Sequence, residues 1–426
     1  MTDISTRYHD IIAPVIAYDT EVEIVEGAGA WVTDADGNRY LDFASGIAVL
    51  NLGHVHPEVL AAAQAQLARL WHAGGTFLYD SILTAAERIV EITPPSIEQV
   101  LFMNSGAEAV EAGVKLARKV SGRQGVMVFR GGFHGRTMGS ISYTTSKAKY
   151  RQGYHPLLPS VFVTPFPHPF RWDMSQEKAD QLALDELERK LRHEVTPEEI
   201  GAFLIEPMQG EGGYYPASRH FLGTVREIAR DHGILFIADE VQTGFGRTGD
   251  WFASQLYDVV PDIMIMGKAI ANGLPLSAVG ASRELLANWA PGSHGTTFGG
   301  NPVSCAASAA TVAVLADVIP FVSKLSDHAF DRLGDLAEQH PTIGDVRGMG
   351  LMIGIELVKD DREPNPDAYT AVAGGALERG LFILPCGPDG NIIRFLPPLN
   401  VSMEDLDRGI DIIDEALTGF ESSGAS

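Results

Sequence analysis

From about residue 100 onward, short apolar runs alternate with longer segments whose apolar residues recur at helical spacing. In one such segment Leu184, Leu187, Leu191 and Val195 follow steps of three, four and four, with charged residues between them, which predicts a surface helix. The short runs are almost continuously apolar, which is typical of a parallel sheet with helices on both faces. The expected strands are residues 100–103, 125–129, 202–205, 234–238 and 262–266, and the expected helices are residues 107–120, 184–195 and 221–232.

Smaller patterns occupy the two ends of the chain. Residues 21–25 alternate polar and apolar side chains, and residues 31–33 and 39–41 flank an Asp36-Gly37 hairpin signal, so residues 21–50 predict a small β meander. The most apolar stretch, residues 306–315, is too short and too rich in alanine to cross a bilayer, and it predicts a buried helix. Further helices are expected at residues 57–70, 371–379 and 403–417, and further strands at residues 350–357 and 392–395.

The length of 426 residues fits a large domain with a smaller partner, since a domain usually has about 100–200 residues. The patterns therefore predict an α/β protein with a large domain around a mostly parallel sheet and a smaller α/β domain. We expect residues 1–57 to join the small domain, residues 58–325 to form the large domain and residues 326–426 to form the rest of the small domain.

The charge balance excludes some partners. Lys and Arg number 32 against 55 Asp and Glu, a net charge of −23, and such a surface repels nucleic acid. The chain has only Cys305 and Cys386, outside any CxxC pattern, so we expect no disulfide framework, no metal site and a reducing, cytoplasmic setting. The first residues lack a basic region followed by an apolar one, so no signal peptide or membrane partner is expected.

Two opposite charges follow neighbouring strands. Asp239 comes at the end of the strand at 234–238, and Lys268 comes shortly after the strand at 262–266. Ligands of open α/β sheets bind outside the carboxyl ends of the strands, so this pair marks a candidate site. A plain salt bridge or two solvated strand ends would produce the same pattern.

Two glycine-containing turns add candidate chemistry. Ser105 and Glu108 form a Ser-x-x-Glu capping box, and the helix start behind it offers free N–H groups to a phosphate, although such boxes are common in purely structural helices. The glycine-rich turn at residues 131–137 brings Phe133, His134 and Arg136 together, although an aromatic residue there can also belong to the core.

A dinucleotide fingerprint is missing. The glycines at 348, 350 and 354 have the spacing G-x-G-x-x-x-G and run into a strand rather than a helix, so we expect a structural turn. A nicotinamide-dependent oxidoreductase, the alternative from another class, therefore lacks its phosphate-binding turn.

Six motifs in order along the chain resemble those of the class III aminotransferases, which are fold-type I pyridoxal-phosphate (PLP) enzymes. The resemblance extends from about residue 31 to residue 417 and is greatest to the 4-aminobutyrate aminotransferases, including residues 42–49 and 394–399. The motifs are Asn104-Ser105-Gly106-Ala107-Glu108-Ala109, Gly132-Phe133-His134-Gly135-Arg136-Thr137, the run from Ile205 to Gly213, Ala238-Asp239-Glu240-Val241-Gln242, Gly267-Lys268 and Thr297-Phe298-Gly299-Gly300-Asn301-Pro302.

The resemblance implies a cofactor site. Lys268 is expected to carry PLP as a Schiff base and to move the substrate proton, and Asp239 to pair with the pyridine nitrogen. Around these two, we expect the phosphate to lie on Ser105, Gly106 and Ala107, with Thr297 reaching it across a dimer interface. The remaining expected contacts of the cofactor are Phe133 and Val241 on its two faces, Gln242 at its hydroxyl and the nearby His134.

The resemblance also implies a substrate site. Arg394 is expected to hold the α-carboxylate of glutamate or 2-oxoglutarate, and Glu211 to pair with Arg394 when the substrate has no α-carboxylate. Arg136 is expected to hold the distal carboxylate, since a guanidinium matches a carboxylate in two parallel hydrogen bonds. Ile47 and Glu206 complete the expected wall.

The predicted function is therefore a PLP-dependent aminotransferase that moves the amino group of an ω-amino acid, 4-aminobutyrate above all, to 2-oxoglutarate by a ping-pong cycle. A homodimer, or an assembly of dimers, is expected. An amino-acid racemase or epimerase, and an ornithine or diamine aminotransferase, remain alternatives on the same scaffold. Residues 72–79 are richer in glycine than the 4-aminobutyrate pattern, which leaves room for a longer or branched amine.

Overall fold

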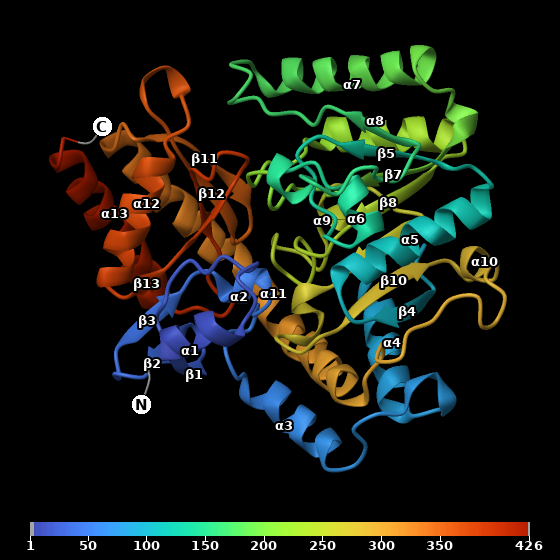
Figure 1. The fold of residues 1–426 in the computed structure, drawn as a ribbon, viewed down its shortest axis with the longest axis horizontal. Helices are drawn as coiled ribbons and strands as arrows, with labels where there is room; N and C mark the ends of the chain where they lie inside the picture. Colours follow the sequence, from blue (N-terminus) through green and yellow to red (C-terminus); the bar gives the residue numbers. More distant parts are fainter. Residues whose placement is uncertain (1–3, 425–426) are drawn as a thin grey trace.

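The computed structural model of the protein describes residues 4–424 and is built around a seven-stranded sheet (Figure 1). Four neighbouring pairs of its strands are parallel, whereas β10 runs antiparallel to both of its neighbours, so the predicted α/β class with a mostly parallel sheet is confirmed. In spatial order the strands are β4 (Gln99–Met103), β10 (Ser277–Ala281), β9 (Ile263–Met266), β8 (Leu235–Asp239), β7 (Ile200–Ile205), β5 (Gly125–Phe129) and β6 (Val161–Thr164).

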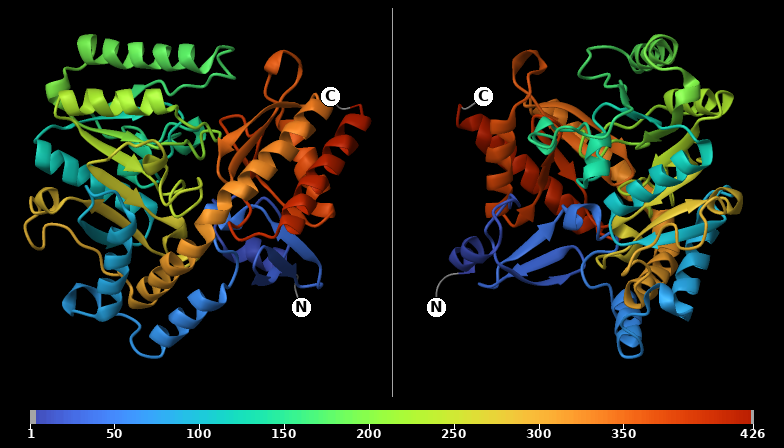
Figure 2. Two further views of the ribbon diagram at one scale, coloured as in Figure 1. Left: turned by 180° about the vertical axis from the view of Figure 1, so that it is seen from behind. Right: turned by 45° about the vertical axis from the view of Figure 1, so that its right-hand side comes forward.

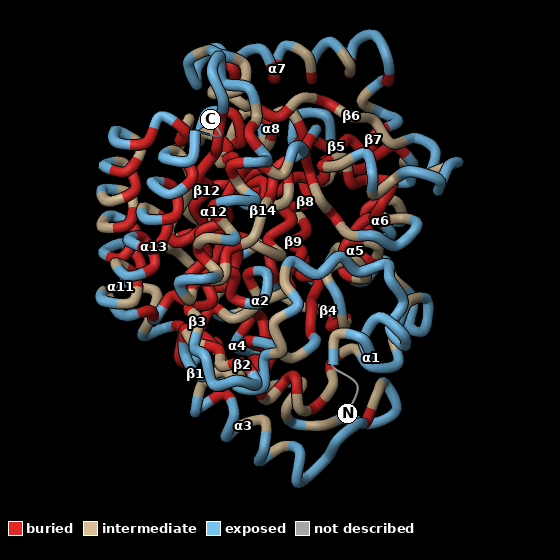
Figure 3. The backbone as a smooth tube through the Cα atoms, turned by 60° about the vertical axis from the view of Figure 1, so that its left-hand side comes forward, coloured by how far each residue is buried: buried red, intermediate tan, exposed pale blue. Residues whose placement is uncertain are grey.

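Helices cover both faces of this sheet. Alternate residues of one strand point to opposite faces, and in β7 Phe203 packs in one apolar cluster with α7 and α8 while Leu204 packs in another with α5. The inner strands of the sheet are therefore buried on both sides, as Figure 3 shows for the centre of the molecule, whereas the edge strands β4 and β6 are partly buried. The covering helices are α5 (Gly106–Ser121), α7 (Gln176–His193) and α8 (Arg219–Asp231), with the short α6 (Met138–Tyr143), α9 (Ala253–Leu256) and α10 (Arg283–Leu286) around them.

Two four-stranded sheets lie beside this large layer (Figure 2). One joins the two ends of the chain, because β13 (Leu381–Phe382) pairs in parallel with β3 (Arg39–Asp42). Its other strands are β1 (Ile24–Ala28) and β2 (Trp31–Asp34), and the second sheet has the order β11 (Ile343–Met349), β12 (Met352–Leu357), β15 (Ile392–Phe395) and β14 (Leu384–Cys386). The helices here are α1 (Ile4–Ile11), α2 (Ser45–Ala48), α12 (Pro366–Glu378) and α13 (Met403–Ser422).

The first strand was predicted too early in the chain. β1 spans Ile24–Ala28 rather than residues 21–25. Its partner β2 ends at Asp34, which lies opposite Ile24, so residues 21–23 have no neighbour in the ladder despite their alternation. The turn at Gly350 was predicted correctly, since it joins β11 to β12 as a tight antiparallel hairpin.

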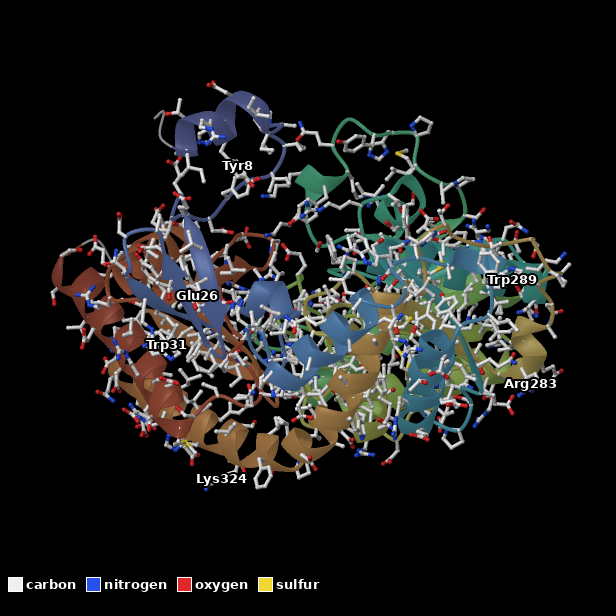
Figure 4. The ribbon with its side chains drawn as sticks, turned by 90° about the horizontal axis from the view of Figure 1, so that it is seen from below. Tyr8, Glu26, Trp31, Arg283, Trp289 and Lys324 are labelled. Carbon is white, nitrogen blue, oxygen red and sulfur yellow. The ribbon has the colours of Figure 1, made fainter. Side chains whose placement is uncertain are left out.

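Helix α11 (Pro302–Gln339) is much longer than the predicted helix at 306–315. With 38 residues and a mean hydropathy of 1.9 in its most apolar window, it has the length and composition to cross a membrane, so the expectation that this stretch is too short was wrong. In this fold it packs against α3 (Pro57–Leu67), α4 (Asp80–Ile92), β11 and α13. The outer face of its second half is polar, and Figure 4 shows Lys324 there. The predicted domain boundary at 325–326 falls inside this helix, and that boundary stays a prediction.

Candidate active site

Three charged residues lie at the carboxyl ends of adjacent parallel strands. Asp239 ends β8, Glu206 follows β7, and Lys268 follows β9 after Gly267. The register brings them to one edge of the sheet, because Ala238 is paired with Ile205 and Asp239 with Ile265. Lys268 has a left-handed backbone, with φ at +48°.

The charge state of Lys268 depends on its surroundings. Burial, reinforced by the positive charge of Arg394, lowers the pKa of Lys268 to about 8, although Glu206, Glu211 and Asp239 oppose the shift. A lysine with this pKa is partly neutral near pH 8, so its amine can act as a nucleophile or accept a proton.

Asp239 is held by a buried histidine. Its Oδ2 lies 2.7 Å from Nδ1 of His134, and its Oδ1 accepts a hydrogen bond from the N–H of Val241 at 3.1 Å. His134 is itself fixed by its N–H, which donates to Oγ1 of Thr144 at 2.9 Å. The carboxylate is thus oriented by two partners, and both it and the imidazole are almost fully buried.

Glu206 is buried at the same edge. Its two carboxylate oxygens accept hydrogen bonds from the N–H groups of Phe133, at 2.9 Å, and Gly210, at 3.0 Å. Burial raises the pKa of Glu206 to about 7, and although His134 opposes this shift the nearby Asp239 adds to it. This carboxylate therefore holds the turn containing Phe133 against the end of β7.

The start of α5 faces this edge. Ser105 accepts a hydrogen bond from the N–H of Glu108 at 3.3 Å, and Glu108 accepts one from the N–H of Ser105 at 3.2 Å, which completes the predicted capping box. Gly106 and Ala107 follow in the first turn, whose N–H groups have no carbonyl partner within the helix. A Cβ on Gly106 would lie 3.1 Å from the side chain of Val241, so this close approach of helix and strand end favours glycine.

A second group of charges surrounds Glu211. This carboxylate forms an ion pair with Arg394 on β15, a second one with Nζ of Lys147 at 2.9 Å, and accepts a hydrogen bond from the hydroxyl of Tyr150 at 2.8 Å. Burial by itself would raise the pKa of Glu211, but the positive charges of Arg394 and Lys147 lower it to about 2. Burial by itself would lower the pKa of Arg394, but the negative charge of Glu211 raises it. The overall effect is a raised pKa of Arg394.

Arg136 reaches the same group through an aromatic ring. Its guanidinium carbon lies 4.4 Å from the ring centre of Tyr150 and 5.7 Å from that of Phe133. Since the hydroxyl of Tyr150 donates to Glu211, a continuous series of contacts connects Arg136 with Arg394. Arg136 is exposed, and within residues 4–424 it forms no ion pair.

Three other predicted residues, Gln242, Ile47 and Thr297, have different surroundings. Gln242 follows Val241 after β8 and accepts a hydrogen bond from the hydroxyl of Tyr214 at 2.8 Å. Ile47, with φ at +66°, lines a cavity of about 620 Å³ together with Asp19 and Tyr369. Thr297 is exposed on the loop before α11, beside Gly74, and nothing in the described part of this single chain brings it to Lys268.

Lys147 and Tyr150 were missed in the sequence. They lie in and beside a short turn, η2 (Ala148–Tyr150), where neither periodicity nor a motif singles them out. A signal that could have found them is the need of Glu211 for more than one cation or donor once it is buried. In the described residues, no group of three or more His, Cys, Asp or Glu side chains is arranged to hold a metal ion.

Comparison with known proteins gives the family. Residues 15–417 match the family described as aminotransferase class-III. The chain is 40% identical to a probable 4-aminobutyrate aminotransferase of Bacillus subtilis, over 92% of each protein. It is 38% identical to a 5-aminovalerate aminotransferase of Pseudomonas aeruginosa, over 95% of this chain and 93% of the relative, and 35% identical to an alanine/serine racemase of Pyrococcus horikoshii, over 92% and 84%.

A solved structure extends this result to the fold and the cofactor. The PLP-bound form of an amine transaminase from an uncultivated Pseudomonas species has a TM-score of 0.88 and 30% identity to this chain, and the match covers 96% of this chain and 97% of the other. The chain therefore belongs to the class III aminotransferases, with their fold, and acts with pyridoxal phosphate on an amino donor and a 2-oxo acid.

Proposed function

We propose that the amino donor is an ω-amino acid, 4-aminobutyrate above all, and that 2-oxoglutarate takes the amino group back in a ping-pong cycle. The observation that carries this proposal is the pairing of Arg394 with Glu211 inside the pocket, while Arg136 remains free of any described carboxylate. Arg394 is thus neutralised within the protein, and Arg136 is open to a substrate carboxylate.

The residues at the sheet edge fit PLP. The first turn of α5, with Gly106 and Ala107, offers N–H groups and a positive helix end to a phosphate. A Cβ on Gly135 would lie 2.6 Å from Ala107, so the turn after β5 comes close to this helix start only with glycine. PLP, when bound, supplies an electron sink for the carbanion that forms once the substrate loses a proton.

Lys268 and Asp239 have separate tasks in this proposal. Lys268 would hold the cofactor covalently and, once free, would move the substrate proton, for which its pKa of about 8 is suited. Asp239 keeps the pyridine nitrogen protonated, and the hydrogen bond from His134 fixes the direction of the carboxylate. Phe133 and Val241 would contact the two faces of the bound cofactor ring, and Gln242 would bond its hydroxyl.

The charged residues around Glu211 allow two substrates to use one pocket. A 4-aminobutyrate molecule places its only carboxylate on Arg136, and Glu211 neutralises Arg394 so that no cation is left unpaired. The donor leaves as an aldehyde. When 2-oxoglutarate follows, its α-carboxylate displaces Glu211 from Arg394, and its distal carboxylate takes Arg136. Ile47 and Glu206 form the wall of this pocket.

The assembly is part of the proposal. Thr297 is exposed in the single chain, as are Trp71, Phe77 and Phe298 near it in sequence or space, which supports a homodimer in which Thr297 reaches the partner's phosphate site. The two cysteines are both unpaired and buried, which supports the reducing cytoplasm as its location.

The visible absorption spectrum of the PLP-loaded protein tests the donor. We expect 4-aminobutyrate, added without an oxo acid, to remove the yellow absorption band, and 2-oxoglutarate to restore it. A parallel sample with 5-aminovalerate measures the effect of one more methylene. A band that ignores both but responds to alanine, with racemisation of the added enantiomer, would replace the proposal by the activity of the racemase relative.

A further inference from the structure

Glu211 uses its two carboxylate oxygens for different partners. Oε2 faces Arg394, whereas Oε1 lies 2.9 Å from Nζ of Lys147 and 2.8 Å from the hydroxyl of Tyr150. The partners of Oε1 come from the turn after α6, and Arg394 comes from β15 in another sheet. The two sides of this carboxylate are therefore attached to different parts of the fold.

The exchange at Arg394 creates a problem for Glu211. When an α-carboxylate occupies Arg394, Glu211 loses that partner, yet its side chain is only 13% exposed. A carboxylate that is buried and unpaired is strongly destabilised, because its lost hydration is not replaced. Without another partner, the penalty on Glu211 would reduce the affinity for every substrate that carries an α-carboxylate.

We propose that Lys147 and Tyr150 are positioning residues that keep Glu211 paired while Arg394 is transferred to the α-carboxylate of glutamate or 2-oxoglutarate. This inference rests on the proposed function, because it concerns the half-reaction in which Arg394 is exchanged. Lys147 and Tyr150 hold Oε1 before the exchange, so Glu211 moves away from Arg394 without passing through an unpaired state. They thereby favour α-carboxylate substrates without touching them.

A direct contact between Lys147 and the distal carboxylate of the substrate is the competing role. The side chain of Lys147 is only 11% exposed and is already paired with Glu211. Arg136, in contrast, is exposed, lies against the aromatic side chains of Tyr150 and Phe133, and forms no ion pair in the described part of the chain. The geometry therefore assigns the distal carboxylate to Arg136 and Glu211 to Lys147.

Four variants of the PLP-loaded enzyme separate these roles, the fourth being the conservative Lys147→Arg. Lys147→Met removes the ion pair with Glu211, and Tyr150→Phe removes only the hydroxyl and keeps the ring against Arg136. Lys149→Met is the matched control, because Lys149 is an exposed lysine 5.7 Å from the same ring centre and is not paired with Glu211. Single-turnover absorbance gives the apparent dissociation constant of each variant for glutamate, for 4-aminobutyrate and for an alkylamine without any carboxylate.

We expect Lys147→Met to weaken glutamate binding by about tenfold to a hundredfold, because Glu211 is left without any cationic partner only when glutamate has taken Arg394. Binding of 4-aminobutyrate and the alkylamine should not change, because Glu211 keeps Arg394 with these donors. Tyr150→Phe should also weaken glutamate binding selectively, but by less. Lys147→Arg should bind glutamate as the parent enzyme does, because it keeps a cation beside Glu211. Lys149→Met should resemble the parent enzyme with all three ligands.

Two outcomes would overturn the inference. Equal losses for glutamate and 4-aminobutyrate in Lys147→Met would place Lys147 on the distal carboxylate, and unchanged binding of glutamate would make it a passive ion pair. If Lys147→Met fails to retain PLP, Tyr150→Phe provides the test in its place, through its loss of glutamate affinity relative to its loss of 4-aminobutyrate affinity. If the parent enzyme rejects 4-aminobutyrate, the donor proposal fails, but the ratio of glutamate to alkylamine affinity still tests this inference.

Discussion

The proposed site has a cofactor end and a substrate end, and these two ends are built in different ways. The cofactor end consists of Lys268, Asp239, His134, Glu206 and the start of α5, and three of these residues are fixed by the register of adjacent parallel strands. The substrate end consists of Arg136, Glu211, Arg394, Lys147 and Tyr150, which come from loops, a turn and a strand of a different sheet.

The difference lies also in how charges are paired. At the cofactor end, Asp239 has one histidine and a backbone N–H as partners within residues 4–424, and both Asp239 and the histidine are buried. At the substrate end, Glu211 has three partners, and one of them is the arginine that a substrate can claim. A rigid sheet edge suits one constant cofactor, whereas ion pairs that can exchange suit two alternating substrates.

The largest effect is expected from removing the lysine of the cofactor end. Lys268→Ala deletes the amine that is proposed to hold the cofactor and move the proton, so turnover should fall by about 10⁴-fold or more with the fold intact. Steady-state kinetics measures the turnover, and circular dichroism checks that the fold is intact. Lys324→Ala, on the outer face of α11, is the control and should keep full activity. Normal turnover in Lys268→Ala would remove the covalent role from this residue.

The next effect tests the constant charge at the same end. Asp239→Asn keeps the shape and an oxygen for His134 but removes the negative charge, so the pyridine nitrogen should lose its proton and turnover should fall by about 10²-fold to 10³-fold. The absorption spectrum of the bound cofactor should change at the same time. Unchanged turnover and spectrum would mean that Asp239 only orients His134.

A smaller and more selective effect is expected at the substrate end. Arg136→Ala should weaken 4-aminobutyrate by about tenfold to a hundredfold and leave a neutral amine of similar length almost unaffected, because only the first carries a carboxylate. The kcat/KM values of both amines give the comparison. Equal losses would show that Arg136 supports Tyr150 and Phe133 and does not contact the substrate.

The smallest effect concerns pH at the cofactor end. Lys268 is cationic below its pKa of about 8 and neutral above it, and in its proposed role only the neutral amine would attack the cofactor. Loading of the cofactor-free protein with PLP should therefore accelerate by about tenfold between pH 7 and pH 9 and then level off. Stopped-flow absorbance measures this rate. A rate that is independent of pH in this range would contradict the lowered pKa.

From the sequence, residues of the proposed cofactor end could be singled out more readily than residues of the proposed substrate end. Asp239 and Lys268 could be singled out because a charged residue after an apolar strand is visible in the local pattern. Lys147 and Tyr150 were not visible, because their importance arises from contact with Glu211, which is distant in the chain. The resemblance to a family supplied Arg136, Glu211 and Arg394, whereas periodicity did not.

The same limits apply to the fold. The strands of the parallel layer were predicted as buried apolar runs, but β10 and its antiparallel direction were not, since its small residues Ser277, Ala278, Gly280 and Ala281 leave no strong apolar signal. The length of α11 was underestimated because its second half carries the mixed polar and apolar pattern of a surface helix, while its first half is almost entirely apolar. A single helix can contain both patterns.

The pairing of β3 with β13 has a consequence for how the chain folds as it is synthesised. Leu41 lies beside Leu381, so the sheet that holds the first strands cannot be completed until almost the whole protein has left the ribosome. Until then the edge of β3 is open to other strands, which is a common origin of aggregation during folding. Pairs so distant in sequence also slow folding, because a long loop must close before the contact forms.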